Sequence, residues 1–209
     1  MTVICAFGTS TTYGAWDIEG GGWVNRLRRH LDETGSKDLI YNAGISGDTT
    51  KDVLERFDVE CKARCKEAKA YKEPFVILFS VGGNDAYLLN GRVMVSKSAF
   101  RRNIRALITK ASRYTKKIFF VEMHLVDESK TTPIPWNRKI SYINRTTMEY
   151  NEILAEICDE KKVPLIRNTD KFTKNYKSML SDGLHPSDKG HEEIYKAVKA
   201  FLIKKGLIT

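Results

Sequence analysis

Short, uninterrupted apolar runs alternate with longer amphipathic stretches along this chain of 209 residues. A strand that is apolar at nearly every position is buried on both faces, and such strands form parallel sheets with helices on both sides. The pattern therefore predicts an α/β fold with a five-stranded parallel sheet. The expected strands run from Val3 to Phe7, Leu39 to Asn42, Phe75 to Ser80, Lys117 to Val121 and Val163 to Arg167.

The stretches between the expected strands carry apolar residues at helical spacing. Phe100, Ile104 and Leu107, for example, fall on one stripe of a helix. No linker-like, repeated or low-complexity segment divides the chain, so we predict a single domain over residues 1–209. The expected helices run from Gly22 to Glu33, Thr50 to Ala68, Lys97 to Tyr114, Ile140 to Lys161 and Lys189 to Lys204.

The chain is basic, with 35 Lys and Arg residues, 26 acidic residues and a formal net charge of +9. Basic residues attract nucleic acid, anionic lipid or acidic substrates where they gather in one place. Here they are spread over many segments and mixed with acidic residues. This favours a lysine-rich solvent face over a specific site for nucleic acid or another polyanion, and nothing in the pattern indicates an oligomeric state.

The sequence also carries signals about location. No apolar run reaches the ~18–20 residues of a membrane span, and the first residues lack the basic start and long apolar core of a signal peptide. We therefore expect a cytoplasmic protein with no membrane span. Cys61 and Cys65 fall on one helix face, but no second Cys or His pair at ligand spacing accompanies them, so reduced thiols are favoured over a zinc site.

Four polar segments follow the expected strands or precede the last helix. Residues 8–10 (GTS) follow the first strand, 42–50 (NAGISGDTT) the second and 82–85 (GGND) the third, while 182–187 (DGLHPS) precede the helix. The carboxyl ends of parallel strands meet at one edge of a sheet, which is where open α/β folds bind their ligands. We therefore expect these segments to converge although they lie far apart in the chain.

The converging residues have the chemistry of a serine nucleophile and its partners. The Ser10 hydroxyl needs a neighbouring base to take its proton, and His185 is the natural candidate. Asp182, three residues earlier, is placed to hold that imidazole in the right tautomer and stabilise its charged form. The backbone N–H groups of Ser10 and Gly47 and the side-chain amide of Asn84 are candidate donors to an oxyanion.

In this order and spread, the segments resemble the SGNH, or GDSL, hydrolases. That family has a serine in Gly-Asp-Ser, a glycine, an asparagine in Gly-x-Asn-Asp and a histidine in Asp-x-x-His, which match Ser10, Gly47, Asn84, and Asp182 with His185. The resemblance implies a flavodoxin-like three-layer α/β/α fold and hydrolysis of esters, including lipids, acetylated sugars and thioesters. It also implies a small-molecule or lipid ester as substrate and no metal or cofactor.

One residue departs from the family pattern, because Thr9 stands where the family has the aspartate of Gly-Asp-Ser. The acid of the proposed catalytic group matches Asp182, so we expect Thr9 to leave catalysis intact. Our hypothesis is that Thr9 alters the rigidity of the serine loop or the shape of the pocket.

The reading favoured by the sequence is an esterase for small acyl groups, since no apolar lid or amphipathic membrane helix is visible. Two alternatives stay open. One is a lysophospholipase or thioesterase acting on longer acyl chains, and the other is a non-catalytic member of the fold that binds carbohydrate or polyanion. The Gly-x-Ser-x-Gly elbow is absent, which argues against the α/β-hydrolase fold.

Several other residues near the expected edge have weaker signals. Asp85 is expected to orient its loop. His124 follows a strand at this edge and either touches substrate or has a structural role, the second being favoured. His191 is expected to face solvent or pack locally within the last helix. The aromatic residues that either line a pocket or belong to the core are Tyr13, Trp16, Tyr87 and Trp136.

Overall fold

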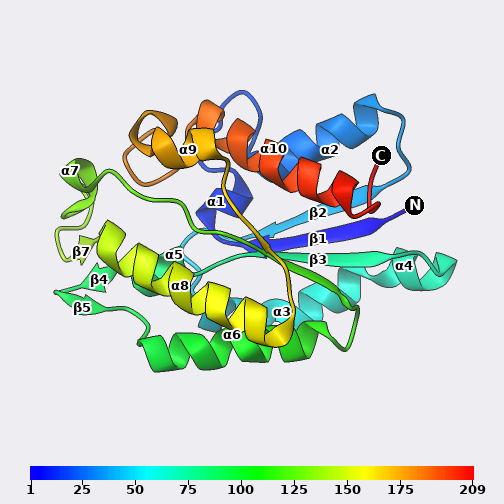
Figure 1. The fold of residues 1–209 in the computed structure, drawn as a ribbon, viewed down its shortest axis with the longest axis horizontal. Helices are drawn as coiled ribbons and strands as arrows, with labels where there is room; N and C mark the ends of the chain where they lie inside the picture. The colour runs from blue at the N-terminus through cyan, green and yellow to red at the C-terminus, as the bar shows by residue number, and fades with distance from the viewer.

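A computed structural model describes residues 1–209 of the protein. Its central sheet has five parallel strands in the order β2-β1-β3-β6-β8 (Figure 1). The predicted α/β fold with a five-stranded parallel sheet is confirmed. The strands are β1 (Val3–Gly8), β2 (Leu39–Gly44), β3 (Phe75–Ser80), β6 (Lys117–Val121) and β8 (Leu165–Ile166).

Helices cover both faces of this sheet and make three layers, as Figure 1 shows. One face is covered by α2 (Trp23–Glu33), α9 (Asp170–Lys174) and α10 (Asp188–Lys204). The other is covered by α3 (Thr50–Arg64), α6 (Lys97–Ala111) and α8 (Asn144–Lys161). Short elements complete the chain: α1 (Ser10–Tyr13), α4 (Lys66–Tyr71), α5 (Gly83–Ala86), α7 (Glu128–Thr131) and a 3-10 turn at Tyr176–Met179.

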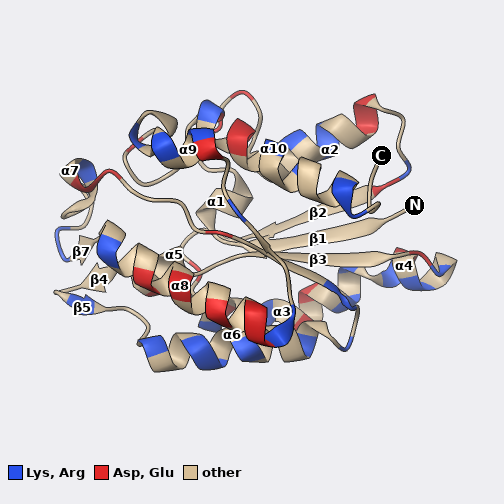
Figure 2. Cartoon of the chain, in the orientation of Figure 1, with Lys and Arg blue, Asp and Glu red and all other residues tan.

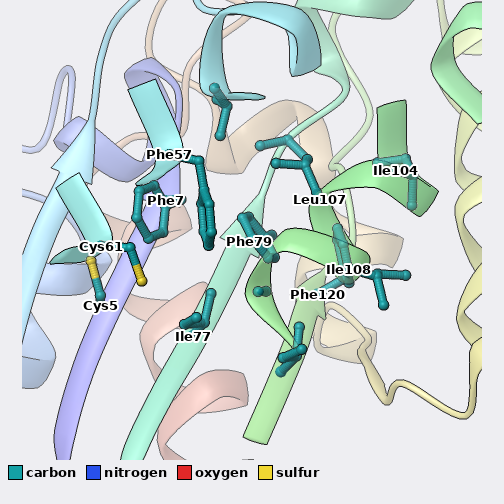
Figure 3. Packing of buried hydrophobic residues seen from close by; sticks show 14 of the residues in the cluster. Cys5, Phe7, Phe57, Cys61, Ile77, Phe79, Ile104, Leu107, Ile108 and Phe120 are labelled. Carbon is teal, nitrogen blue, oxygen red and sulfur yellow. The ribbon is translucent and has the colours of Figure 1, made fainter. Parts of the chain in front are cut away.

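The apolar runs are explained by burial on both faces of the sheet. Alternate residues of β1 enter two different cores, with Cys5 and Phe7 on the α3 side and Ile4 and Ala6 on the α2 side. On the α3 side, Phe7 packs against Phe57 with ring centroids 4.9 Å apart (Figure 3). Such burial of apolar surface is the main stabilising contribution to a fold of this kind.

Three predicted elements differ most from the structure, and several others differ by one to three residues at one end. The helix expected over 50–68 is two helices, α3 and α4, which meet at Cys65. The strand expected over 163–167 is only two residues long, and the helix expected from Ile140 begins at Asn144. The last difference has a physical cause, because Ile140 and Ser141 pair with Leu89 and Leu88 as a strand and so cannot join the helix.

Ile140 and Ser141 belong to a small antiparallel sheet that the sequence pattern did not predict. Its strands are β4 (Leu88–Leu89), β5 (Arg92–Val93) and β7 (Ile140–Ser141), in the order β5-β4-β7. The sheet joins the two long connections after β3 and β6 beyond the carboxyl ends of the main strands (Figure 1).

Charged side chains lie on the helices and loops, and both signs occur on the same helices (Figure 2). Across α6 and α8, Arg101 pairs with Glu156 and Arg105 with Glu160, each at 2.6 Å. None of the helices combines the length and apolar composition that crossing a membrane requires.

The four cysteines are free thiols, and all four are buried. Cys5 and Cys61 belong to the same core cluster as Phe7 and Phe57 (Figure 3). Burial raises the pKa of Cys61 and of Cys158 to about 12. These thiols therefore stay protonated and behave as small apolar side chains.

Truncating Phe57 should test the aromatic core. The ring is fully buried and packs against Phe7, Phe79 and Tyr114. Phe57→Ala should lower the free energy of unfolding by about 3–5 kcal/mol, measured by urea denaturation. Val59, on the same helix, is 75% exposed. Val59→Ala should change the stability by less than about 0.5 kcal/mol, and equal losses in the two variants would contradict this account.

Candidate active site

Ser10 lies where β1 turns into α1. The turn is tight, because a Cβ atom at Gly8 would lie 2.0 Å from Thr12 Oγ1 and 2.6 Å from the Ser80 carbonyl oxygen. Only glycine allows α1 to fold back so closely on the ends of the strands. Ser10 is the first residue of α1, and its backbone N–H has no acceptor within the chain.

His185 approaches Ser10 from the segment that leads into α10. Its Nε2 lies 3.1 Å from Ser10 Oγ, and its Nδ1 lies 2.8 Å from Asp182 Oδ2. The other oxygen of Asp182 accepts the backbone N–H groups of Leu184 (2.9 Å) and His185 (2.7 Å). Ser10, His185 and Asp182 thus form a continuous hydrogen-bonded chain, although Ser10 and His185 are 175 residues apart.

The environment keeps Asp182 ionised. Burial favours the neutral acid, but the hydrogen bonds from the side chain and backbone of His185 outweigh it and lower the pKa of the carboxyl to about 2. Because the Asp182 carboxylate can only accept, His185 Nδ1 must carry the proton. Nε2 is then the free acceptor that faces the Ser10 hydroxyl.

Asn84, in α5, is held by both ends of its amide. Its Nδ2 donates to the Asp48 carbonyl at 2.9 Å, and its Oδ1 accepts from the Tyr142 hydroxyl at 2.9 Å. These two bonds fix the plane of the amide and leave one N–H of Nδ2 uncommitted. The side chain is nearly buried, with 8% of the residue exposed.

Gly47 lies in the loop between β2 and α3, next to the residue whose carbonyl holds Asn84. It has φ +87°, a left-handed conformation that favours glycine, and its N–H has no acceptor within the chain. Asp48 pairs with Arg56 at 2.7 Å, and Arg56 Nη2 donates to the Gly8 carbonyl at 3.1 Å. The loops after β1, β2 and β3 are therefore bonded to one another.

Asp85 supports the same loops from inside the protein, as expected for a loop-orienting residue. It is fully buried and accepts hydrogen bonds from the backbone N–H and the hydroxyl of Thr50, at the start of α3. Asn103 Nδ2 in turn donates to the Thr50 hydroxyl oxygen at 2.9 Å. Burial is the largest influence on this carboxyl and raises its pKa to about 7.

A cavity of about 60 Å³ opens between these groups, and Ser10, Asn84 and His185 line it. Gly47 does not line this cavity. Tyr142 lines the cavity, but none of the aromatic residues singled out from the sequence does: Tyr13, Trp16, Tyr87 and Trp136. No group of three His, Cys, Asp or Glu side chains is arranged to hold a metal ion. The apolar part of the wall consists of Val81, Val121, Met123, Val126, Leu184 and Ile194.

The remaining histidines differ in their roles. His191 is fully buried, so the prediction that it faces solvent was wrong, and local packing is correct. Its Nδ1 accepts the Trp23 N–H at 3.3 Å and its Nε2 lies 3.0 Å from the Ala15 carbonyl oxygen, so it ties α10 to the loop before α2. His124 lines the cavity beside Thr11.

Tyr142 was not singled out from the sequence, although it lines the cavity and its hydroxyl donates to Asn84 Oδ1.

A sequence profile of the GDSL-like lipase/acylhydrolase family matches residues 6–193 of the chain, which include all of the residues in this site. The chain belongs to this family. The resemblance predicted from Ser10, Gly47, Asn84, Asp182 and His185 is therefore confirmed.

Relatives and solved structures agree with the family. The crystal structure of a lipase/acylhydrolase from Enterococcus faecalis has a TM-score of 0.75 and 24% identity, covering 100% of this chain and 98% of that one, so it shares the fold. A Bos taurus protein named isoamyl acetate-hydrolyzing esterase 1 homolog is 26% identical, covering 97% of this chain and 82% of that protein. Esterase TesA of Pseudomonas aeruginosa is 25% identical, with 79% and 70% covered. The protein is an ester hydrolase of the GDSL family.

Removing the Tyr142 hydroxyl should lower kcat. Tyr142→Phe frees the Asn84 amide to rotate while keeping the ring, so kcat should fall roughly 10-fold with KM nearly unchanged, as for a group that acts on the transition state. Tyr87 packs against Tyr142 with ring centroids 5.3 Å apart and does not line the cavity. Tyr87→Phe is the matched control and should keep full activity in the same ester assay. An equal loss in both variants would contradict the role of the Tyr142 hydroxyl.

Asp85 should make the protein less stable as pH rises. Its pKa is about 7 in the folded state against an ordinary 3.8, so between these values the folded protein holds a proton that the unfolded chain has lost. The free energy of unfolding therefore falls as pH rises through this range. Asp85→Asn should reduce the fall between about pH 5 and about pH 8 by about 2–3 kcal/mol in urea denaturation.

Asp52 provides the control for that experiment. Hydrogen bonds from Thr49 outweigh its burial and lower the pKa of its carboxyl, so it stays ionised across the same range. Asp52→Asn should leave the slope between the two pH values as in the wild type. If Asp85→Asn also lost stability with pH as steeply as the wild type does, Asp85 would not be the group that titrates between these pH values.

Proposed function

We propose that the protein is a serine esterase that releases a small acyl group through an acyl-enzyme on Ser10. The observation that carries this proposal is the chain of contacts from Ser10 Oγ to His185 Nε2 (3.1 Å) and from His185 Nδ1 to Asp182 Oδ2 (2.8 Å). That geometry places a base within hydrogen-bonding distance of the nucleophile and a carboxylate behind the base.

In the first half of the reaction, Ser10 Oγ attacks the ester carbonyl carbon and its proton passes to His185 Nε2. Asp182, ionised because its pKa is about 2, stabilises the imidazolium and keeps Nδ1 protonated. The bond from the carbonyl carbon to the alcohol oxygen then breaks. His185 returns its proton to that oxygen, and the alcohol leaves the acyl group on Ser10.

In the second half, water attacks the acyl carbonyl while His185 takes one of its protons. The bond to Ser10 Oγ breaks, the proton returns to Ser10, and the carboxylic acid is released. In both halves the negative carbonyl oxygen is stabilised by the N–H groups of Ser10 and Gly47 and the Nδ2 of Asn84. The lack of internal acceptors for the two backbone groups and the bonds that fix the Asn84 amide support this assignment.

The size and lining of the cavity favour a small acyl group, such as acetyl. A cavity of about 60 Å³ has room for only a few non-hydrogen atoms. Its wall includes Val81, Val121 and Ile194, which suit a short hydrocarbon. The relative named as an isoamyl acetate-hydrolyzing esterase homolog is consistent with this choice. Longer acyl chains, as in lysophospholipids or long-chain thioesters, exceed this volume.

Thr9 acts on the shape of the pocket in this proposal. It lines the cavity, is 8% exposed and makes no side-chain capping bond to α1. The serine loop is held instead through the Gly8 carbonyl, which accepts from Arg56 Nη2 and from the Ile45 N–H. A cytoplasmic location and the absence of a metal or cofactor requirement stay predictions from the sequence.

Replacing the nucleophile should abolish turnover. Ser10→Ala should lose at least ~1000-fold in kcat on p-nitrophenyl acetate and should not react with a fluorophosphonate probe. Thermal unfolding should show that the variant remains folded. Ser98→Ala, which removes a hydroxyl from α6 outside the cavity, should react and turn over like the wild type. Full turnover by Ser10→Ala would refute the mechanism, and a wild type that the probe does not label would favour a non-catalytic binding protein.

A further inference from the structure

A second cavity adjoins the first and is much larger, about 360 Å³. The two cavities share the residues Glu122, Met123 and His124, which follow β6. From there the second cavity extends between α8 and the segment around α9, away from Ser10. The proposed mechanism uses none of this space.

The ring of His124 stands between the two cavities. On one side its Nε2 lies 3.5 Å from the hydroxyl of Thr11, which lines the catalytic cavity. On the other side its ring lies 5.7 Å, between centroids, from Phe172, which lines the second cavity. Its Nδ1 lies 3.1 Å from the Leu125 carbonyl oxygen, so Nδ1 carries the proton and Nε2 is the acceptor. The ring is thus held in place from three sides.

The second cavity suits a hydrocarbon. Met148, Ala155 and Phe172 supply apolar surface from α8 and α9. Several of the polar groups in its wall have partners within the chain, whereas the carboxylate of Glu152 on α8 is exposed and has none. Asn151 bonds the backbone N–H and carbonyl of Met123, at 3.1 and 2.8 Å.

Glu122 is likewise occupied, by Arg167 at 2.7 Å and by the Asn168 N–H at 3.1 Å. A cavity whose wall is apolar in part, and in which several of the nearby polar groups are paired, favours an apolar ligand.

We propose that His124 sets the acyl-chain length of this enzyme by closing the catalytic cavity off from the second one. This inference rests on the proposed esterase function. The ligand class for the second cavity is the tail of an acyl chain, which would enter it wherever residue 124 leaves an opening. The acyl part is the half of the ester concerned, because it stays bound to Ser10 after the alcohol has departed.

Opening this wall should change the chain-length preference. We would measure kcat/KM of the wild type and His124→Ala on p-nitrophenyl acetate, butanoate, hexanoate and octanoate. The ratio of octanoate to acetate should rise roughly 10-fold or more in the variant, because the added methylenes are buried in the second cavity. An unchanged ratio in a folded variant that still hydrolyses acetate would overturn the proposal.

Two further variants distinguish the steric effect of residue 124 from an effect of the imidazole itself. His124→Phe keeps a ring of similar size and should retain the wild-type preference. Adding Ala155→Phe to His124→Ala refills the second cavity from α8 and should remove the gain on octanoate while acetate hydrolysis persists. A gain that survives the refilling would overturn the proposal, as would a gain seen only on acetates of longer alcohols.

The test also has a readout without turnover. In a Ser10→Ala background, His124→Ala should bind decanoate at least ~10-fold more tightly than His124→Phe, measured by calorimetry. Equal affinities would overturn the assignment of the second cavity. A wild type that hydrolyses no ester would instead refute the proposed function, so the two failures can be told apart. Should His124→Ala not fold, His124→Val tests the same point on butanoate and hexanoate.

Discussion

The parallel register of β1 with its two neighbours is the constraint on which the site depends. Gly8 at the end of β1 is level with Gly44 of β2 on one side and with Ser80 of β3 on the other. Three loops therefore leave the sheet at the same height, and they bring Ser10, Gly47 and Asn84 to one edge. A side chain at Gly8 would meet both Thr12 and the Ser80 carbonyl, so this register requires glycine there.

Register alone does not fix the side chains; buried polar contacts between the loops do. The Arg56 guanidinium joins the loops after β1 and β2, and the Asp48 carbonyl joins the loops after β2 and β3. Asp85 and Thr50 make a second connection beneath them. Buried polar groups that are paired with one another rigidify a structure, whereas an unpaired one destabilises it. The donors in the proposed oxyanion site are thus held in position before any ester binds, as the proposed electrostatic stabilisation requires.

Much of this arrangement can be predicted from the sequence, for identifiable reasons. The strands are recognisable because burial on both faces makes them uniformly apolar. The site residues are recognisable because they follow strands or precede the last helix in a set order. The small antiparallel sheet could not be predicted, because its strands have two residues each and so show no hydrophobic periodicity. Tyr142 belongs to that part of the chain. Its contact with Asn84 depends on how two long connections pair, which no local pattern encodes.

The charge of His124 bears on the proposed chemistry as well as the shape of the site. Burial, more than any neighbouring charge, lowers the pKa of His124 to about 4, and the nearby His185 adds to the effect. His124 is therefore neutral at neutral pH. A cationic ring at that position would repel the imidazolium that forms on His185 when Ser10 gives up its proton. Because the ring is neutral, that repulsion is absent, so the group proposed to close off the cavity also leaves His185 free for its proposed role as a base.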